Sequence, residues 1–241
     1  MVGLYGCGSF ASSKDTSSLP DSVDWREEGA VTPVKDQGQC GSCWTFSATG
    51  AMEGAWATST GDLVSLSEEQ LADCATGFKY GSHGCNGGQM DGAFKYAIEN
   101  GATTEGQYPY TAGRGKTGEC QQGDVTSVAT FTGCYDVAPN DQVSLKAAVA
   151  KQPVSIAIEA DTRYFQSYSS GVLTSSDCGT NLDHGVLIVG YGEDKGQKYW
   201  LVKNSWSNTW GDEGYVKIAR SDSRNDKGIC GIAMQPSFIS V

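Results

Sequence analysis

The amino-acid sequence predicts an α+β protein with two packed lobes and a cleft between them. In the first half of the chain, apolar residues recur at helical spacing. In the second half, short apolar runs separated by Gly, Asp and Asn are typical of strands. Because helices come first and strands afterwards, two packed lobes are favoured, and 241 residues of which 39% are hydrophobic can bury a substantial core.

Four segments are expected to be helical. The first follows Cys43, in FSATGAMEGAW. The second begins at Ser67, where the S-x-x-Q pattern has the form of a capping box, and ends near Cys74. The third is MDGAFKYAIEN, with Gly101 as its C-terminal cap, and the fourth spans about residues 141–151.

Beyond residue 153 the pattern becomes that of strands. Four runs are expected to be β-strands: VSIAIEA, GVLIVGYGE, KYWLVKNSW and GYVKIARS. Residues 74–88, CATGFKYGSHGCNGG, are interpreted as a glycine-rich loop. Residues 1–18 are interpreted as a polar, flexible lead-in, because they lack the basic start and apolar stretch of a secretory signal.

The charge and hydropathy of the chain argue against two classes of partner. The net charge is −11 and the Lys and Arg residues are scattered, so neither a nucleic acid nor an anionic membrane surface is expected to bind. The longest apolar run, GVLIVGY, is far too short to cross a bilayer.

Nine cysteines indicate several disulfides and one leftover thiol, which implies an oxidising compartment. Within DQGQCGSCWTF, Cys40 and Cys43 could form a redox pair, half of a metal site, or a bridging cysteine beside a nucleophile. A zinc site would need two more ligands at short spacing, and no second C-x-x-C or H-x₃₋₅-H is present. The redox and metal alternatives are therefore weak.

Two histidines are candidates for a general base. His83 lies in the glycine-rich loop and is interpreted as a solvated loop residue. His184 begins an apolar strand in the other half of the chain, where it can face a cleft. A cysteine nucleophile acts as the thiolate, so its pKa must be lowered, and the start of a helix at Cys43 together with a protonated His184 would do this.

Three further residues complete a hypothetical catalytic site. Asn204 is expected to fix the imidazole ring of the base, and Trp206 is expected to shield that hydrogen bond from water. The Gln37 amide, six residues before the candidate nucleophile, is expected to donate to an oxyanion.

Together these motifs resemble the papain family of cysteine proteases. The resemblance rests on Gln37, on Cys40-Gly41-Ser42-Cys43-Trp44, on Asp183-His184 and on Asn204-Ser205-Trp206. CNGG at 85–88, YPY at 108–110 and WGDEGY at 210–215 are further landmarks, and the likeness runs from Leu19 to the C-terminus. By pattern, cathepsin L-like and plant papain-like endopeptidases are the most similar.

The resemblance implies a two-lobed papain-like domain over residues 19–241. A helical lobe would span about residues 28–135 and an antiparallel β-barrel lobe about residues 136–237, with the termini crossing between the lobes. Residues 1–18 would be an N-terminal extension, either a leader or a remnant of the inhibitory pro-region that the printed sequence lacks.

The resemblance also implies the roles of individual residues. Cys43 would attack the peptide carbonyl, His184 would act as acid and base, Asn204 would orient the imidazole, and Gln37 would bind the oxyanion. No cofactor or metal is implied. The residues expected to contact substrate are Gly87, Gly88, Met90, Ala157, Leu182, Asp183, Gly185, Trp206 and Gln235.

The substrate position two residues before the scissile bond is expected to prefer Leu or Phe over Arg. The walls of the corresponding pocket, assigned by motif matching, are apolar or small, and Gln235 near its floor carries no charge. An arginine there would gain a hydrogen bond but no ion pair.

The family's disulfides imply that Cys40 pairs with Cys85, Cys74 with Cys120, and Cys178 with Cys230. Cys7 and Cys134 remain. One hypothesis is a fourth disulfide that ties residues 1–18 to the body of the protein, and the alternative is two unpaired thiols with a disordered leader.

We therefore expect a monomeric cysteine endopeptidase that acts on proteins or peptides in a lysosome, a vacuole or the extracellular space. Epoxides of the E-64 type and cystatin-like proteins are expected to inhibit it. Two rival interpretations are an inactive binding or storage protein with the same fold, and an oxidoreductase that uses Cys40 and Cys43. The sequence has no obvious insertion that would block the cleft, which favours an endopeptidase over an exopeptidase.

Overall fold

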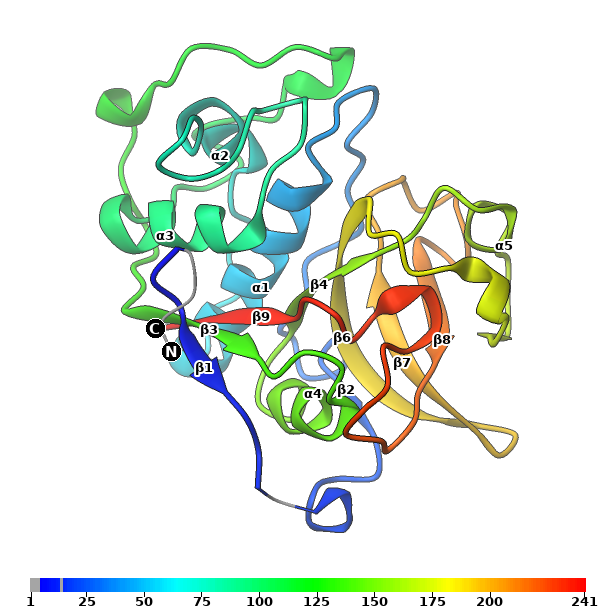
Figure 1. The fold of residues 1–241 in the computed structure, drawn as a ribbon. Helices are drawn as coiled ribbons and strands as arrows, with labels where there is room; N and C mark the ends of the chain where they lie inside the picture. Colours follow the sequence, from blue (N-terminus) through cyan, green and yellow to red (C-terminus); the bar gives the residue numbers. More distant parts are fainter. Residues whose placement is uncertain (1–4, 14) are drawn as a thin grey trace.

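The computed structural model describes residues 5–13 and 15–241 and confirms the predicted α+β class. Figure 1 shows α1, α2 and α3 together in one half of the molecule and β6, β7 and β8 in the other. The α-helices are α1 (Cys43–Thr60), α2 (Glu68–Cys74), α3 (Met90–Asn100), α4 (Gln142–Val149) and α5 (Arg163–Gln166). The strands are β1 (Gly8–Phe10), β2 (Val23–Asp24), β3 (Gly133–Val137), β4 (Val154–Ile158), β5 (Val172–Leu173), β6 (His184–Asp194), β7 (Gln197–Lys203), β8 (Tyr215–Ala219) and β9 (Ser237–Ser240).

The helix boundaries follow the capping groups of the sequence. The Ser67 hydroxyl accepts a hydrogen bond from the Gln70 N–H at 3.0 Å and so starts α2. The Asp141 carboxylate accepts from the first N–H groups of α4 in the same way. Helix α3 ends at Gly101, whose φ of 73° suits a residue without Cβ.

The strands form one nine-stranded sheet in the order β1-β3-β9-β4-β6-β7-β8-β5, and β2 pairs with β6. Two neighbouring pairs in this sheet are parallel, β1 with β3 and β5 with β8, and the other paired strands are antiparallel. Both pairs join a strand of two or three residues to a partner far along the chain, which no local pattern reveals.

Residues 5–13 differ from the flexible lead-in that the sequence predicts over residues 1–18, while residues 1–4 and 14 lie outside the described residues. Strand β1 pairs with β3, and the ring of Phe10 packs edge-on against Phe238 with centroids 5.3 Å apart. Beyond the strand, the Ser12 N–H donates to the Ser144 hydroxyl at 2.9 Å. Cys7 and Cys134 are joined by a disulfide, the pairing that was one of two sequence hypotheses.

Replacing both Cys7 and Cys134 with Ala is expected to lower the free energy of unfolding by about 2–4 kcal/mol, because the disulfide constrains a long loop of the unfolded chain. Denaturant titration of the variant and the wild type measures the difference. Peptide hydrolysis should be nearly unchanged at temperatures where both proteins are folded. An unchanged unfolding midpoint would contradict the expectation.

Helix α1 packs against both the other helices and the sheet, so it belongs to both halves of the molecule. Gly50 and Gly54 permit this close packing: a Cβ on Gly50 would lie 2.6 Å from the Leu187 side chain, and one on Gly54 would lie 2.4 Å from Pro153. The Ser47 hydroxyl donates to the Val186 carbonyl of β6 at 2.7 Å. The N-terminus of α1 is thereby held against the start of β6.

In the part of the chain that the structure describes, no helix combines the length and the apolar character that a bilayer crossing requires.

Candidate active site

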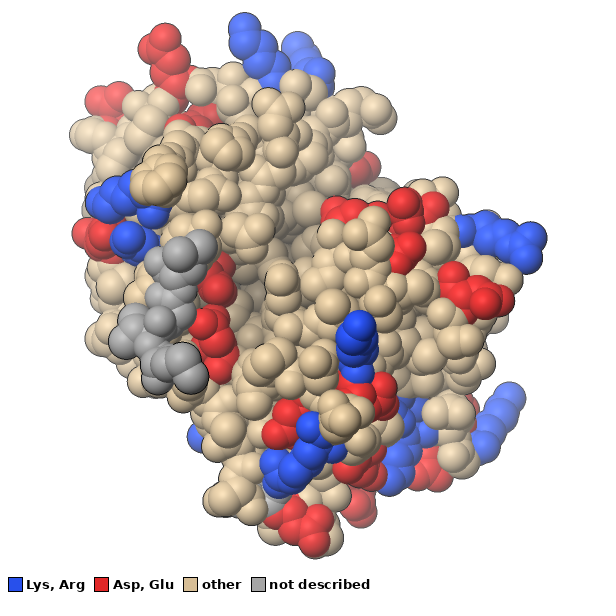
Figure 2. Space-filling model, in the orientation of Figure 1, with Lys and Arg blue, Asp and Glu red and all other residues tan. Residues whose placement is uncertain are grey.

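A groove of about 510 Å³ lies where the N-terminus of α1 meets the start of β6. Figure 2 shows a hollow between the two halves of this face, with acidic side chains on its rim. The groove brings together every residue that the sequence analysis assigned to substrate contact, and also three of the four catalytic candidates. The lining includes Gln37, Cys43, Gly87, Gly88, Met90, Ala157, Leu182, Asp183, His184, Gly185, Trp206 and Gln235.

Cys43 is the first residue of α1 and the one cysteine of nine without a disulfide partner. Its Sγ accepts a hydrogen bond from the Gly185 N–H at 3.3 Å. Burial alone would raise the thiol pKa, but the hydrogen bond and charge of His184, together with the N–H groups of Gly185 and Trp44, leave it lowered. The surroundings of Cys43 therefore favour the thiolate.

His184 is buried and hydrogen-bonds to both Cys43 and Asn204. Its Nε2 lies 2.8 Å from Asn204 Oδ1, which also accepts from the Ser205 N–H at 2.8 Å. Because Oδ1 is an acceptor, His184 Nε2 must donate, which leaves Nδ1 for the thiol. Burial would lower the imidazole pKa, but the interaction with Cys43 leaves it raised, so a thiolate and an imidazolium stabilise each other.

The indole of Trp206 lies against the imidazole of His184. The rings of Trp206 and His184 are 4.7 Å apart and inclined by 33°. Phe165 of α5 packs edge-on against the same indole at 5.6 Å. These rings limit the access of water to the hydrogen bond between His184 and Asn204.

Gln37 is held on several sides, which the sequence alone does not indicate. Its N–H donates to the Ser205 carbonyl at 2.9 Å, and its Oε1 accepts from the Ser205 hydroxyl at 2.8 Å. Its Nε2 donates one hydrogen to the Cys40 carbonyl at 3.0 Å. A primary amide has two N–H bonds, so the second is available to a group in the groove.

Comparison with known proteins agrees with this arrangement. The sequence profile of the family described as papain family cysteine protease matches residues 19–240. The chain belongs to this family.

Papain-family relatives cover nearly all of the described chain. A probable cysteine protease RD21C of Arabidopsis thaliana is 53% identical over 222 residues, which are 92% of this chain and 48% of the relative. Cathepsin L of Sarcophaga peregrina is 53% identical over 93% of this chain and 65% of that protein. The chain thus spans about half the length of the Arabidopsis relative.

Solved structures of the family have the same fold. Bromelain protease from Ananas comosus, in complex with the E64 inhibitor, has a TM-score of 0.85 and 43% identity over 92% of this chain and 100% of that one. The proform of the ragweed pollen allergen Amb a 11 has a TM-score of 0.86 and 46% identity over 92% of this chain and 67% of that one.

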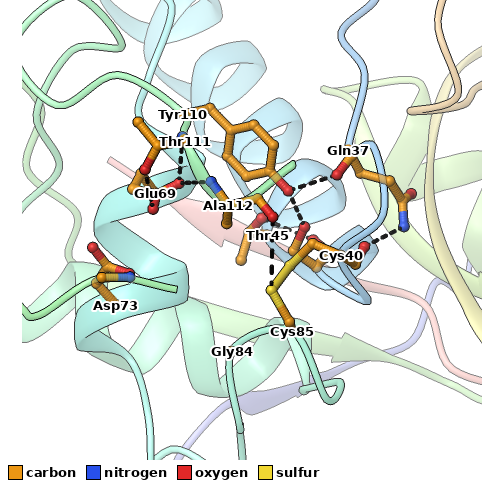
Figure 3. The surroundings of a disulfide bond; sticks show 12 residues. Gln37, Cys40, Thr45, Glu69, Asp73, Gly84, Cys85, Tyr110, Thr111 and Ala112 are labelled. Carbon is orange, nitrogen blue, oxygen red and sulfur yellow. Dashed lines mark hydrogen bonds between the residues drawn. A yellow bond between two sulfur atoms is a disulfide. The ribbon is translucent and has the colours of Figure 1, made fainter. Parts of the chain in front are cut away.

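The groove is also lined by the CNGG sequence, Cys85 to Gly88. Figure 3 shows Cys85 next to Cys40. A disulfide joins Cys85 of this loop to Cys40, and the Gly41 N–H donates to the Cys85 carbonyl at 3.0 Å. A Cβ on Gly88 would lie 2.6 Å from the Trp44 ring, and Gly87 has a φ of 99°. Both positions therefore need glycine.

The other three disulfides are those named in the sequence analysis: Cys7 with Cys134, Cys74 with Cys120, and Cys178 with Cys230. Cys40 is committed to Cys85, so it cannot form a dithiol pair with Cys43 while that bond is present. His83 is exposed and outside the groove lining, and its N–H donates to the Gly87 carbonyl at 2.8 Å.

The groove adjoins a second cavity of about 520 Å³ that shares Gln89, Met90 and Gln235 with it. Asp91 and Asp136 line this second cavity. Burial and the neighbouring Asp136 carboxyl raise the pKa of Asp91 to about 7. Among the described residues, these two carboxyls and the Cys7 sulfur form the single group with metal-ligating spacing, but the Cys7 sulfur is already bonded to Cys134.

A cluster of buried charges lies behind the groove. Glu53 of α1 accepts from the Thr32 hydroxyl at 2.6 Å, the Leu66 N–H at 2.9 Å and the Lys35 ammonium at 3.1 Å. Lys35 also contacts Glu68 at 2.7 Å. Burial raises the pKa of Glu68 to about 7, while the two carboxylates raise the pKa of Lys35 against the opposing effect of burial. A small cavity lined by these groups and by Asn204 separates them from the site.

Proposed function

We propose that this protein is a cysteine endopeptidase that cleaves peptide bonds with Cys43, His184 and Asn204. The observation that carries the proposal is the single unpaired thiol at the N-terminus of a helix, hydrogen-bonded to a buried imidazole whose other nitrogen bonds an asparagine oxygen. The pKa of the thiol is lowered and that of the imidazole is raised, so the thiolate that a nucleophile requires is favoured beside an imidazolium.

The reaction would proceed in two halves. The Cys43 thiolate attacks the peptide carbonyl, and the resulting oxyanion accepts hydrogen bonds from the free Gln37 N–H and the Cys43 backbone N–H. The His184 imidazolium gives its proton to the leaving amine, and a thioester remains on Cys43. Neutral His184 then takes a proton from water as that water attacks the thioester, which releases the carboxylic acid and regenerates the Cys43 thiolate beside the His184 imidazolium. Asn204 keeps the imidazole ring in one orientation throughout.

The substrate would lie extended across the groove. The backbone of Gly87 and Gly88 would hydrogen-bond to the substrate main chain, since the absence of side chains allows close approach. The pocket for the side chain two residues before the scissile bond would be formed by Met90, Ala157 and Leu182, with Gln235 at its floor. Burying a Leu or Phe there contributes roughly 1.5–3 kcal/mol.

We expect Leu or Phe to be clearly preferred over Arg at that substrate position. Gln235→Glu should raise the turnover of Arg peptides relative to Leu peptides, above the pKa of the new carboxyl, because an ion pair becomes possible. The measurement is kcat/KM for matched Leu and Arg peptides with both enzymes. Equal turnover of the two peptides by the wild-type enzyme would contradict the assignment of the pocket.

Titration with an E-64-type epoxide tests the catalytic assignment. One equivalent should alkylate Cys43 and abolish peptidase activity, with the modified residue identified by peptide mapping. An active-site thiol that reacts without any peptidase activity would favour an inactive binding or storage protein. Disulfide exchange by Cys40 and Cys43 would instead favour the oxidoreductase alternative.

The remaining proposals concern the setting in which the enzyme acts. Four disulfides fit an oxidising compartment, for which we propose a lysosome, a vacuole or the extracellular space. We propose protein or peptide substrates, a monomeric enzyme and inhibition by cystatin-like proteins. Residues 19–241 would form the peptidase domain, with residues 1–18 as its extension.

A further inference from the structure

The hydroxyl of Tyr110 contacts two groups in the stretch of chain that precedes and begins α1. It contacts the Gln37 carbonyl oxygen at 2.8 Å and the Ser42 hydroxyl at 2.7 Å. Figure 3 shows the ring of Tyr110 beside Gln37, with the dashed line from its hydroxyl to the Gln37 oxygen. Tyr110 is outside the groove lining and would not touch a substrate.

The direction of each hydrogen bond follows from the groups involved. A carbonyl oxygen can only accept, so the Tyr110 hydroxyl gives its one hydrogen to Gln37. The Ser42 hydroxyl must then donate to Tyr110. Burial raises the pKa of Tyr110 to about 12, so this hydroxyl keeps its proton throughout the range in which such an enzyme works.

This arrangement changes the usual role of the Ser42 side chain. Ser42 is the N-cap residue of α1, where serine commonly accepts from an N–H of the first turn, yet here it makes no such bond. Its hydroxyl points to Tyr110 instead. The Thr45 N–H donates to the Ser42 carbonyl at 2.8 Å, so the Trp44 N–H is left to the Cys43 thiolate and the Cys43 N–H to the oxyanion.

Tyr110 is itself held firmly in place. Its N–H donates to Glu105 at 2.8 Å, and its ring packs edge-on against Phe46 of α1 at 5.0 Å. The next two N–H groups, of Thr111 and Ala112, both donate to Glu69, at 2.8 and 2.9 Å. A fixed hydroxyl can impose its position on the groups that it bonds.

A backbone hydrogen bond also connects the residues after Tyr110 to those after Gln37. The Gln39 N–H donates to the Gly113 carbonyl at 2.8 Å. Gly38 has a φ of 61°, and a Cβ there would lie 2.5 Å from the Gly113 oxygen. The segment 110–113 therefore braces the turn that carries Gln37.

We propose that Tyr110 is a positioning residue for peptide hydrolysis, whose hydroxyl sets the Gln37 backbone and the Ser42 hydroxyl so that the two oxyanion donors converge on one point. Ser205 fixes the Gln37 side chain from the other side. The proposal rests on the role of Gln37 as an oxyanion donor, which is part of the proposed function.

The test compares Tyr110→Phe with Tyr108→Phe in the whole protein. Tyr108 belongs to the same YPY sequence, but its hydroxyl contacts Asp73 at 2.7 Å, away from the site. Tyr110→Phe should lower kcat for a peptide amide roughly 3- to 10-fold, since the hydrogen bonds of its hydroxyl with Gln37 and Ser42 are lost. KM should change by less than about twofold. Tyr108→Phe should leave kcat unchanged.

Two measurements distinguish the loss of oxyanion-donor positioning from a general disturbance of the active site. Iodoacetamide alkylates the thiolate by displacing iodide and forms no oxyanion, so its rate with Tyr110→Phe should equal the wild-type rate. In a Gln37→Ala background, which should itself lower kcat about 100- to 1,000-fold, adding Tyr110→Phe should have no further effect. Ser42→Ala should reproduce part of the Tyr110→Phe loss, and thermal unfolding of each variant establishes that it is folded.

Four results would overturn the proposal. An unchanged kcat in Tyr110→Phe would do so, and so would an equal fall in the alkylation rate, which would indicate a disturbed ion pair. A loss of kcat in the double variant equal to the product of the two single losses would show that the residues act independently. That result would remove the link between Tyr110 and Gln37 while leaving Gln37 as an oxyanion donor. A fully active Gln37→Ala enzyme would instead remove both this inference and the proposed role of Gln37.

Discussion

A His184→Ala variant is expected to lose about four orders of magnitude in kcat/KM for peptide substrates. The imidazole stabilises the Cys43 thiolate, protonates the leaving amine and activates water, so its removal affects both halves of the proposed reaction. Initial rates with a fluorogenic peptide measure the loss. His83→Ala is the matched control, because His83 is exposed and outside the groove, and it should retain nearly full activity. Comparable losses in both variants would mean that the base is wrongly assigned.

The pH dependence of the wild-type enzyme follows from the same pair. As the pH falls, the Cys43 thiolate is protonated at its lowered pKa, which gives the acid limb of the profile. As the pH rises, His184 loses its proton at its raised pKa, which gives the alkaline limb. Activity should therefore be bell-shaped. In His184→Ala, the rate of thiol alkylation should stay low at neutral pH and increase only as the pH approaches the ordinary cysteine pKa of about 8.5.

A Glu53→Ala variant is expected to lose about 3–5 kcal/mol in free energy of unfolding, the second large effect. Glu53 is 1% exposed and satisfies the Thr32 hydroxyl, the Leu66 N–H and the Lys35 ammonium. Removing it leaves buried donors without an acceptor and Lys35 with one carboxylate instead of two. Denaturant titration measures the change.

Lys79→Ala is the control for this prediction. Lys79 also forms an ion pair, with Glu99, but its side chain is 58% exposed, so solvent can replace the partner. Its unfolding transition should lie close to that of the wild type. If Glu53→Ala unfolded at the same denaturant concentration as Lys79→Ala, the buried interactions of Glu53 would contribute no more to stability than the exposed Lys79–Glu99 pair.

The sequence predicts helices α1 to α4 and the strands of the sheet centre because each leaves a local pattern, whereas the substrate-contact residues of the groove came from the family resemblance. The S-x-x-Q cap at Ser67 is visible in four residues, and the strand that begins at His184 is visible as an apolar run. The pairing of Cys40 with Cys85 came from the family resemblance, since spacing alone leaves the partners open.

The features that the sequence did not predict depend on contacts between distant segments. Strand β1 has three residues and is defined only by its partner β3, more than a hundred residues away. Nothing near Lys35 indicates that Glu53 and Glu68 surround it, because charged residues on helices usually face solvent. The contact of Tyr110 with Gln37 joins residues 73 positions apart and involves groups with no distinguishing local pattern.

The close packing of Gly50 against β6 and of Gly54 against Pro153 has a consequence for motion. Helix α1 carries Cys43 and is fixed to β6, which carries His184, so the two walls of the groove cannot rotate apart without separating this packed surface. Hinge closure around a ligand needs a few residues that absorb a large backbone rotation, and a tightly packed helix provides none. Substrate should therefore meet a groove that is already in its working shape, and its association rate should not be limited by a conformational change.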